Sequence, residues 1–115
     1  METSLKEINS YTRQLDITIP WELIQGEYEK DFSRARSSYS MKGFRRGKVP
    51  EKIVRKNLGH SIDANFAEDS INTYYRKALD ELKLAPINQA SIDNLEFKEG
   101  LPLSFSARFE VSVLR

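Results

Sequence analysis

The 115-residue sequence predicts an α+β fold, an antiparallel sheet packed against helices in the order β-α-α-α-β-β. Two segments, 12–19 and 103–113, alternate between apolar and polar side chains, as half-buried strands do. The region between them, 21–83, repeats its apolar residues at steps of three and four, which is typical of amphipathic helices. Because the length is that of one ordinary domain, we expect 1–115 to form a single domain.

The first half of the sequence predicts one strand followed by one long helix. The strand should cover 12–19, because Pro20 removes an amide donor directly after it. Residues 1–11 are less periodic, and whether they extend this strand through a bend is left open. Pro20 also suits the start of a helix, which should run from 21 and end in the serine-rich stretch 37–40.

Two further helices are expected before the second group of strands. Pro50 offers a helix start and Gly59 a helix stop, so the second helix should be short, over residues 50–58. The third should begin after Ser61 as its N-cap and reach about Lys83. We expect the loop between the first two helices, around residues 43–50, to be exposed.

The C-terminal part reads as a hairpin. Residues 87–97 are rich in strand formers, residues 98–100 supply a turn with glycine, and 103–113 give the most regular alternation in the chain. The last strand should pair with its hairpin partner and with strand 12–19. The first and third helices should then cover the apolar face of the sheet.

The composition excludes most kinds of active site. Cysteine is absent and His60 is the only histidine, so a disulfide framework, a thiolate nucleophile and a Cys/His metal set are excluded. We therefore expect no catalytic residues, no metal and no cofactor. No apolar run approaches the roughly 18–20 residues of a membrane span, and residues 1–11 do not resemble a secretory signal. We expect a cytoplasmic protein with no membrane partner.

The charges are unevenly distributed along the chain. The segment from Ser33 to Gly59 contains nine basic residues and a single acid, Glu51, so it carries +8 and the rest of the chain −7. A local field of this size can steer a polyanion or an acidic protein surface, although a charge run alone is more often a solvated face.

The loop 43–50, with the sequence GFRRGKVP, places an aromatic ring and two arginines between two glycines. Arginine forks can bind carboxylate or phosphate, and an exposed Phe44 can anchor in a partner. In the competing interpretation Phe44 folds back on the second helix, and composition does not decide between them. Docking requires that the Phe44 ring is exposed and that Arg45 and Arg46 are not neutralised inside the protein.

At this loop the sequence resembles the N-terminal, ribosome-binding domain of trigger factor, a bacterial chaperone family. The signature of that family is Gly-Phe-Arg-x-Gly-Lys-x-Pro, and every fixed position is filled here. The strand before Pro20, the Tyr-Tyr-Arg-Lys-Ala-Leu helix and the final Ser-Phe-Ser-Ala-Arg-Phe strand also look like family elements. Arg46 stands where many members carry lysine, which keeps the charge but changes its geometry.

The resemblance implies docking at the polypeptide exit of the large ribosomal subunit, on an exit-tunnel protein and nearby ribosomal RNA, to shelter nascent polypeptides. The expected contact residues are Phe44, Arg45 and Arg46, with Gly43, Gly47, Lys48 and Pro50 completing the site and Arg34, Arg36, Lys42 and Lys52 as supporting charges. Full-length members add a prolyl-isomerase domain and a helical chaperone domain, which we expect to be missing here. We therefore expect no isomerase activity from these residues, although a longer parent protein would carry it.

Two other interpretations remain open at this point. The basic segment 34–56 could act as an RNA-binding module without a protein partner, although only Tyr39 and Phe44 supply aromatic rings for stacking. The strand 101–114 could instead present an edge through which a weak homodimer forms.

Overall fold

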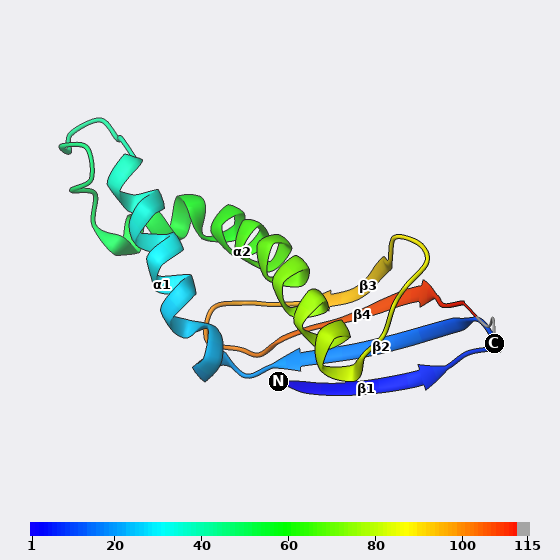
Figure 1. Ribbon diagram of the computed structural model, residues 1–115. Coiled ribbons are helices and arrows are strands. Elements are labelled where there is room, and N and C mark those ends of the chain that lie inside the picture. Colours follow the sequence, from blue (N-terminus) through cyan, green and yellow to red (C-terminus); the bar gives the residue numbers. More distant parts are fainter. Residues whose placement is uncertain (113–115) are drawn as a thin grey trace.

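The computed structural model describes residues 1–112, which form four strands and two helices. In chain order these are β1 (Glu2–Glu7), β2 (Thr12–Ile19), α1 (Trp21–Ser38), α2 (Glu51–Leu82), β3 (Ser91–Glu96) and β4 (Leu103–Glu110). The molecule is elongated, measuring 65 × 24 × 20 Å. As Figure 1 shows, α1 and the start of α2 project beyond one end of the sheet, and we call residues 21–66 the helical arm.

The sheet has the strand order β1-β2-β4-β3, and all neighbouring strands are antiparallel. Ile17 lies opposite Phe105, and Leu15 lies opposite Ala107, so the alternating apolar residues of β2 and β4 share one buried face. This pairing confirms the expectation that the last strand joins both its hairpin partner and strand 12–19. Val113, the end of the predicted strand 103–113, lies outside the described residues.

Because β4 lies between β2 and β3, the expectation that strand 101–114 presents an edge for a homodimer is wrong for residues 103–110. The edges of the sheet are β1 and β3 instead.

The segment that the sequence left open forms a separate strand, β1. It pairs with β2 in an unbroken register in which Leu5 lies opposite Leu15. The turn between them is set by Asn9, whose side-chain oxygen accepts hydrogen bonds from the backbone N–H groups of Tyr11 and Thr12 at 3.1 and 2.9 Å. The observed order is therefore β-β-α-α-β-β.

The prediction of two separate helices over 50–58 and from Ser61 was wrong, because one continuous helix, α2, spans both. Gly59 lies inside this helix, where a Cβ would meet nothing within 4 Å. A glycine inside a helix costs only about 1 kcal/mol relative to alanine, less than the packing of the apolar residues on either side contributes. Val54, Ile62 and Phe66 are buried on both sides of Gly59 and hold the helix together.

The two helices pack differently relative to the sheet. The C-terminal half of α2 lies across the apolar face of the sheet (Figure 1), as expected for the predicted third helix. By contrast, α1 packs against α2 and leans away from the sheet. Aromatic rings fill the junction between arm and sheet: Tyr28 contacts Trp21, Phe66 and Phe97 at centroid distances of 5.4 to 5.8 Å. The arm therefore has a packed base and carries the α1–α2 loop away from the sheet.

Candidate functional site

The loop between α1 and α2, residues 39–50, lies at the end of the helical arm farthest from the sheet (Figure 1). Its two ends are tied together, because the Gly47 N–H donates to the carbonyl of Tyr39 at 3.2 Å. The Tyr39 hydroxyl in turn accepts a hydrogen bond from the Asn57 amide of α2 at 2.9 Å. The loop is therefore closed at its base rather than free at both ends.

The C-terminal side of the loop is fixed by Val49, which is completely buried although its neighbours Lys48 and Pro50 are exposed. The Arg36 guanidinium of α1 donates to the Val49 carbonyl at 2.9 Å and lies 3.8 Å from the Glu51 carboxylate. Arg36 thus joins the end of α1 to the start of α2. Arg36 was expected to be one of the supporting charges, and its contact with Val49 was not predicted. The one signal in the sequence was the apolar Val49 within a charged loop.

Two glycines shape the turns of the loop. Gly43 and Gly47 have φ angles of 92° and 78°, a left-handed conformation that side chains other than glycine rarely adopt. Across Gly47, the Lys48 N–H donates to the Arg45 carbonyl at 2.9 Å. Positions 43 and 47 are therefore glycines because the backbone turns there with positive φ angles.

The tip of the loop presents Phe44, Arg45 and Arg46 to solvent. The Phe44 residue is 43% exposed and belongs neither to the buried core nor to the apolar residues packed against it. Arg45 and Arg46 are exposed, and within residues 1–112 neither guanidinium forms a hydrogen bond or an ion pair. Both conditions for docking are met by this geometry, because the Phe44 ring is exposed and neither arginine is neutralised by a carboxylate among the described residues.

The structure divides the nine basic residues of the segment 33–59 into two groups. Three arginines have carboxylate partners: Arg34 pairs with Asp31 at 3.4 Å, Arg36 with Glu51, and Arg55 with Glu51 and Glu99. Among the described residues the other six have no such partner: Lys42, Arg45, Arg46, Lys48, Lys52 and Lys56. Of the predicted supporting charges, Lys42 and Lys52 are thus available to a partner, whereas Arg34 pairs with Asp31 at the surface and Arg36 with Glu51.

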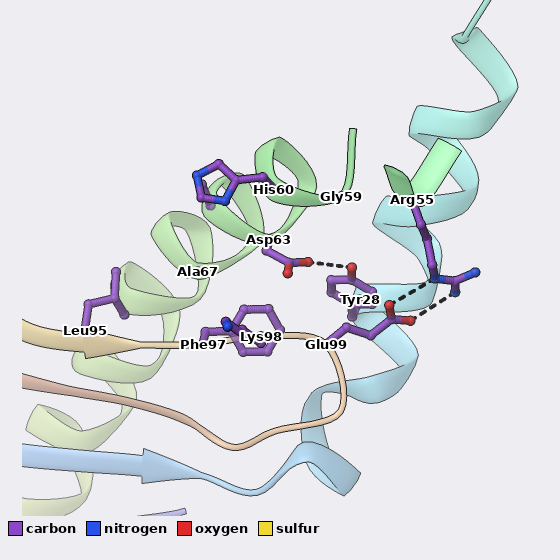
Figure 2. Close-up of a pocket in the computed structure, with 11 residues that line it drawn as sticks. Tyr28, Arg55, Gly59, His60, Asp63, Ala67, Leu95, Phe97, Lys98 and Glu99 are labelled. Carbon is purple, nitrogen blue, oxygen red and sulfur yellow. Dashed lines mark hydrogen bonds and ion pairs between the residues drawn. The ribbon is translucent and has the colours of Figure 1, made fainter. Parts of the chain in front are cut away.

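A second feature is a hollow of about 540 Å³ between α1, α2 and the β3–β4 turn. In Figure 2 the Tyr28 hydroxyl points at Asp63, to which it donates a hydrogen bond of 2.6 Å. Burial and this carboxylate together raise the pKa of Tyr28 above its usual value. His60, on the rim, is not joined to any cluster of metal-binding side chains within residues 1–112. Two side-chain pairs line the hollow, Tyr28 with Asp63 and Arg55 with Glu99.

Comparison with known proteins gives the family. A family model described as bacterial trigger factor protein (TF) matches residues 1–112. The chain belongs to the trigger factor family. Over 111 residues it is 30% identical to the trigger factor of Geobacter sp. (strain M21) and 32% identical to that of Chlorobaculum parvum. Each alignment covers 96% of this chain and 26% of the relative, so the chain spans about a quarter of the length of these trigger factors.

The fold agrees with this assignment. A solved structure described as "Promiscuous Substrate Recognition in Folding and Assembly Activities of the Trigger Factor Chaperone" superposes with a TM-score of 0.71 at 17% identity, over 96% of this chain and 26% of that one. The resemblance to trigger factor that the loop signature indicated is thus confirmed over nearly the whole chain. Neither α1 nor α2, the helices within residues 1–112, has the length and hydropathy to cross a bilayer.

Proposed function

We propose that residues 1–115 act as a single ribosome-docking domain of a trigger-factor chaperone. The loop tip would bind at the polypeptide exit of the large ribosomal subunit, on an exit-tunnel protein and the neighbouring ribosomal RNA. One observation carries the proposal: at the end of the helical arm an exposed phenyl ring lies beside two guanidinium groups that have no ion-pair partner within residues 1–112. Phe44, Arg45 and Arg46 are the proposed contact residues, with Gly43, Gly47, Lys48 and Pro50 setting the shape of the loop.

The ring and the charges have different tasks in this proposal. Burying the Phe44 ring in a partner is worth roughly 1.5–3 kcal/mol, whereas each exposed ion pair contributes only about 0–1 kcal/mol. The positive charge instead raises the rate at which the loop finds an acidic surface, and this effect weakens within a Debye length of about 8–10 Å. Phe44 therefore supplies most of the binding free energy, and the basic residues raise the association rate.

The wider role follows from family membership. We propose that the docked protein works in the cytoplasm and assists the folding of nascent polypeptides as they leave the ribosome. For the 115-residue chain we predict no prolyl-isomerase activity. A proline-peptide isomerisation assay that gives a rate above background for this chain would contradict that prediction.

Cosedimentation with ribosomes tests the docking proposal. The triple variant Phe44→Ala/Arg45→Ala/Arg46→Ala should no longer pellet with ribosomes, while its circular dichroism spectrum and melting temperature stay near those of the wild type. A matched control, Leu23→Ala/Arg76→Ala/Lys77→Ala, removes one exposed apolar and two exposed basic side chains elsewhere and should pellet normally. Unchanged pelleting of the loop variant would remove the loop from the mechanism.

Basic residues without internal partners also support a second candidate, an RNA-binding module that uses residues 34–56 alone. That function predicts equal affinity for naked ribosomal RNA and for intact ribosomes, a steep salt dependence, and no loss on Phe44→Ala. Ribosome docking instead predicts tighter binding to intact ribosomes than to naked ribosomal RNA, and a loss of binding on Phe44→Ala.

A weak homodimer is a further proposal, for which sedimentation at several protein concentrations is the test. Since β4 is an interior strand, such a dimer would have to form elsewhere on the molecule.

A further inference from the structure

Two lysines extend the positive charge from the loop along α2. Lys52 and Lys56 lie in the first two turns of α2 and are both exposed. A separation of four residues places them on one face of the helix, about 6 Å apart along its axis. Lys48 precedes them in the loop, so lysines recur at steps of four from the loop into the helix.

The nearby carboxylates are already occupied. Glu51 lies 3.8 Å from Arg36 and 3.2 Å from Arg55, and both oxygens of Glu99 accept hydrogen bonds from Arg55. Within residues 1–112 Lys52 and Lys56 have no carboxylate within ion-pair distance. The fold thus neutralises the arginine of this helical segment and leaves its two lysines available to an external anion.

The chemistry of the pair is suited to a phosphate backbone. Lysine ammonium groups are compact point charges with rotatable donors, which suit a row of phosphates and do not need the fixed fork geometry that a guanidinium offers to a carboxylate. No aromatic residue occurs between Val49 and Leu58, so the helical segment that carries the two lysines has no ring of its own on which bases could stack. It can bind a nucleic-acid backbone without reading the bases.

We propose that Lys52 and Lys56 bind the phosphate backbone of an RNA strand beside the site of the loop tip. The inference rests on ribosome docking and assigns separate partners to the two parts of the surface. The tip, with its ring and arginines, has the composition of a protein-binding hot spot, and the lysine pair has that of a phosphate contact.

The salt dependence of ribosome binding tests the lysine pair. Lys52→Gln/Lys56→Gln should still bind at low salt, but the slope of log affinity against log salt should fall in magnitude by about 1 per lysine. Lys52→Arg/Lys56→Arg should keep the wild-type slope. The control Arg76→Gln/Lys77→Gln removes the same charge from the other end of α2 and should also leave the slope unchanged. A wild-type slope in the Lys52→Gln/Lys56→Gln variant would overturn the proposal.

A photocrosslink identifies the partner, since an acidic protein surface would also show salt dependence. A photoreactive phenylalanine placed at position 56 should crosslink the protein to ribosomes. Ribonuclease should shorten the crosslinked product, whereas protease treatment of the ribosomal proteins should leave its attached RNA unchanged. An adduct only with protein, or no adduct at position 56 while the same probe at position 44 reacts, would overturn the proposal.

These outcomes are distinguishable from failure of the docking function. If ribosome docking itself is wrong, the unmodified chain does not pellet and the probe at position 44 gives no adduct. If only the RNA contact is wrong, binding and the adduct at position 44 remain.

Discussion

Arg55 and Glu99 connect the helical arm to the turn between β3 and β4. The Arg55 guanidinium donates to both carboxylate oxygens of Glu99, each at 3.0 Å, although the two residues are 44 positions apart in the sequence. Its third nitrogen reaches Glu51 at 3.2 Å, and the group lies 4.3 Å from the centre of the Phe32 ring. The bonds to Glu99 first, and then to Glu51, hold the pKa of Arg55 above its usual value. The same contacts remove one positive charge from the segment that we propose to dock.

Removing this contact should have little effect on stability and none on docking. In Glu99→Gln the free energy of unfolding should fall by about 0–1 kcal/mol, because the two side chains are 42% and 36% exposed and water screens their attraction. Ribosome pelleting should not weaken, since Arg55 becomes available as an additional cation. Denaturant unfolding and cosedimentation measure the two effects. Loss of pelleting in a folded Glu99→Gln protein would show that the contact positions the arm.

The hydrogen bond from Arg36 to Val49 should matter more for docking than for the global fold. Arg36→Met leaves the Val49 carbonyl without its guanidinium donor, a loss of about 1 kcal/mol that falls on the loop. We expect faster tryptic cleavage at residues 42–48 and weaker ribosome binding with an unchanged salt slope. The control Arg34→Met removes an arginine that pairs only with Asp31 among the described residues, and should behave like the wild type. Equal protease resistance in both variants would contradict this role.

The two loop glycines should differ in their tolerance of alanine. Both have positive φ angles, so either substitution strains the backbone by about 1–2 kcal/mol. A Cβ at Gly47 would also lie 3.2 Å from the Ser37 carbonyl oxygen, whereas one at Gly43 would meet nothing within 4 Å. Gly47→Ala should therefore raise amide exchange in the loop and weaken ribosome binding more than Gly43→Ala does. The reverse order, measured by hydrogen exchange and pelleting, would contradict the loop geometry.

The sequence predicted those parts of the fold in which the side chains themselves carry the pattern. Strands β2 and β4 were predicted because one face of each is buried and the other is not. Strand β1 was not, because five of its six residues are exposed and its position comes from backbone pairing with β2. The split of α2 at Gly59 gave a single glycine more weight than the apolar residues that continue at steps of four from Val54 to Phe66.

The candidate site could be predicted to a similar extent. The sequence left open whether the Phe44 ring is exposed or folds back on the second helix, and the structure shows it exposed beside two exposed arginines. The bonds from Arg36 to Val49 and from Arg55 to Glu99 could not be predicted from the sequence, because these partners lie 13 and 44 positions away. The number of charges can be read from the sequence, but which of them are neutralised depends on the fold.

The polar face of the sheet should lose stability in acid through Asp16. The Ser106 hydroxyl donates to this carboxylate at 2.7 Å, and Gln14 and Lys6 add to it, so the pKa of Asp16 lies below its usual 3.8. As the pH falls through 3.8, the unfolded chain binds a proton before the folded one does, so stability that is present above this pH is lost. In Ser106→Ala the acid-induced decrease should be smaller, as denaturant unfolding at pH 6 and pH 3 would show. An unchanged decrease would rule out this contact as the cause.

The junction of arm and sheet should weaken in alkali through Tyr28. Burial, and then the hydrogen bond to Asp63, raise the pKa of this phenol above its usual 10.0. Above pH 10 the unfolded chain therefore releases the proton while folded Tyr28 keeps it, so the free energy of unfolding falls, by at most about 1.4 kcal/mol per pH unit. Burial raises the pKa of Tyr75 in the same direction.

The alkaline decrease should therefore be smaller in Tyr28→Phe and largely retained in Asp63→Asn, because burial is the larger cause of the shift at Tyr28. Denaturant unfolding at pH 8 and pH 10.5 compares the variants, with Tyr75→Phe as a second reference. Tyr28→Phe should also be less stable at pH 8, since it loses the 2.6 Å hydrogen bond between α1 and α2. If Asp63→Asn removed the alkaline decrease as fully as Tyr28→Phe, the carboxylate rather than burial would control the phenol.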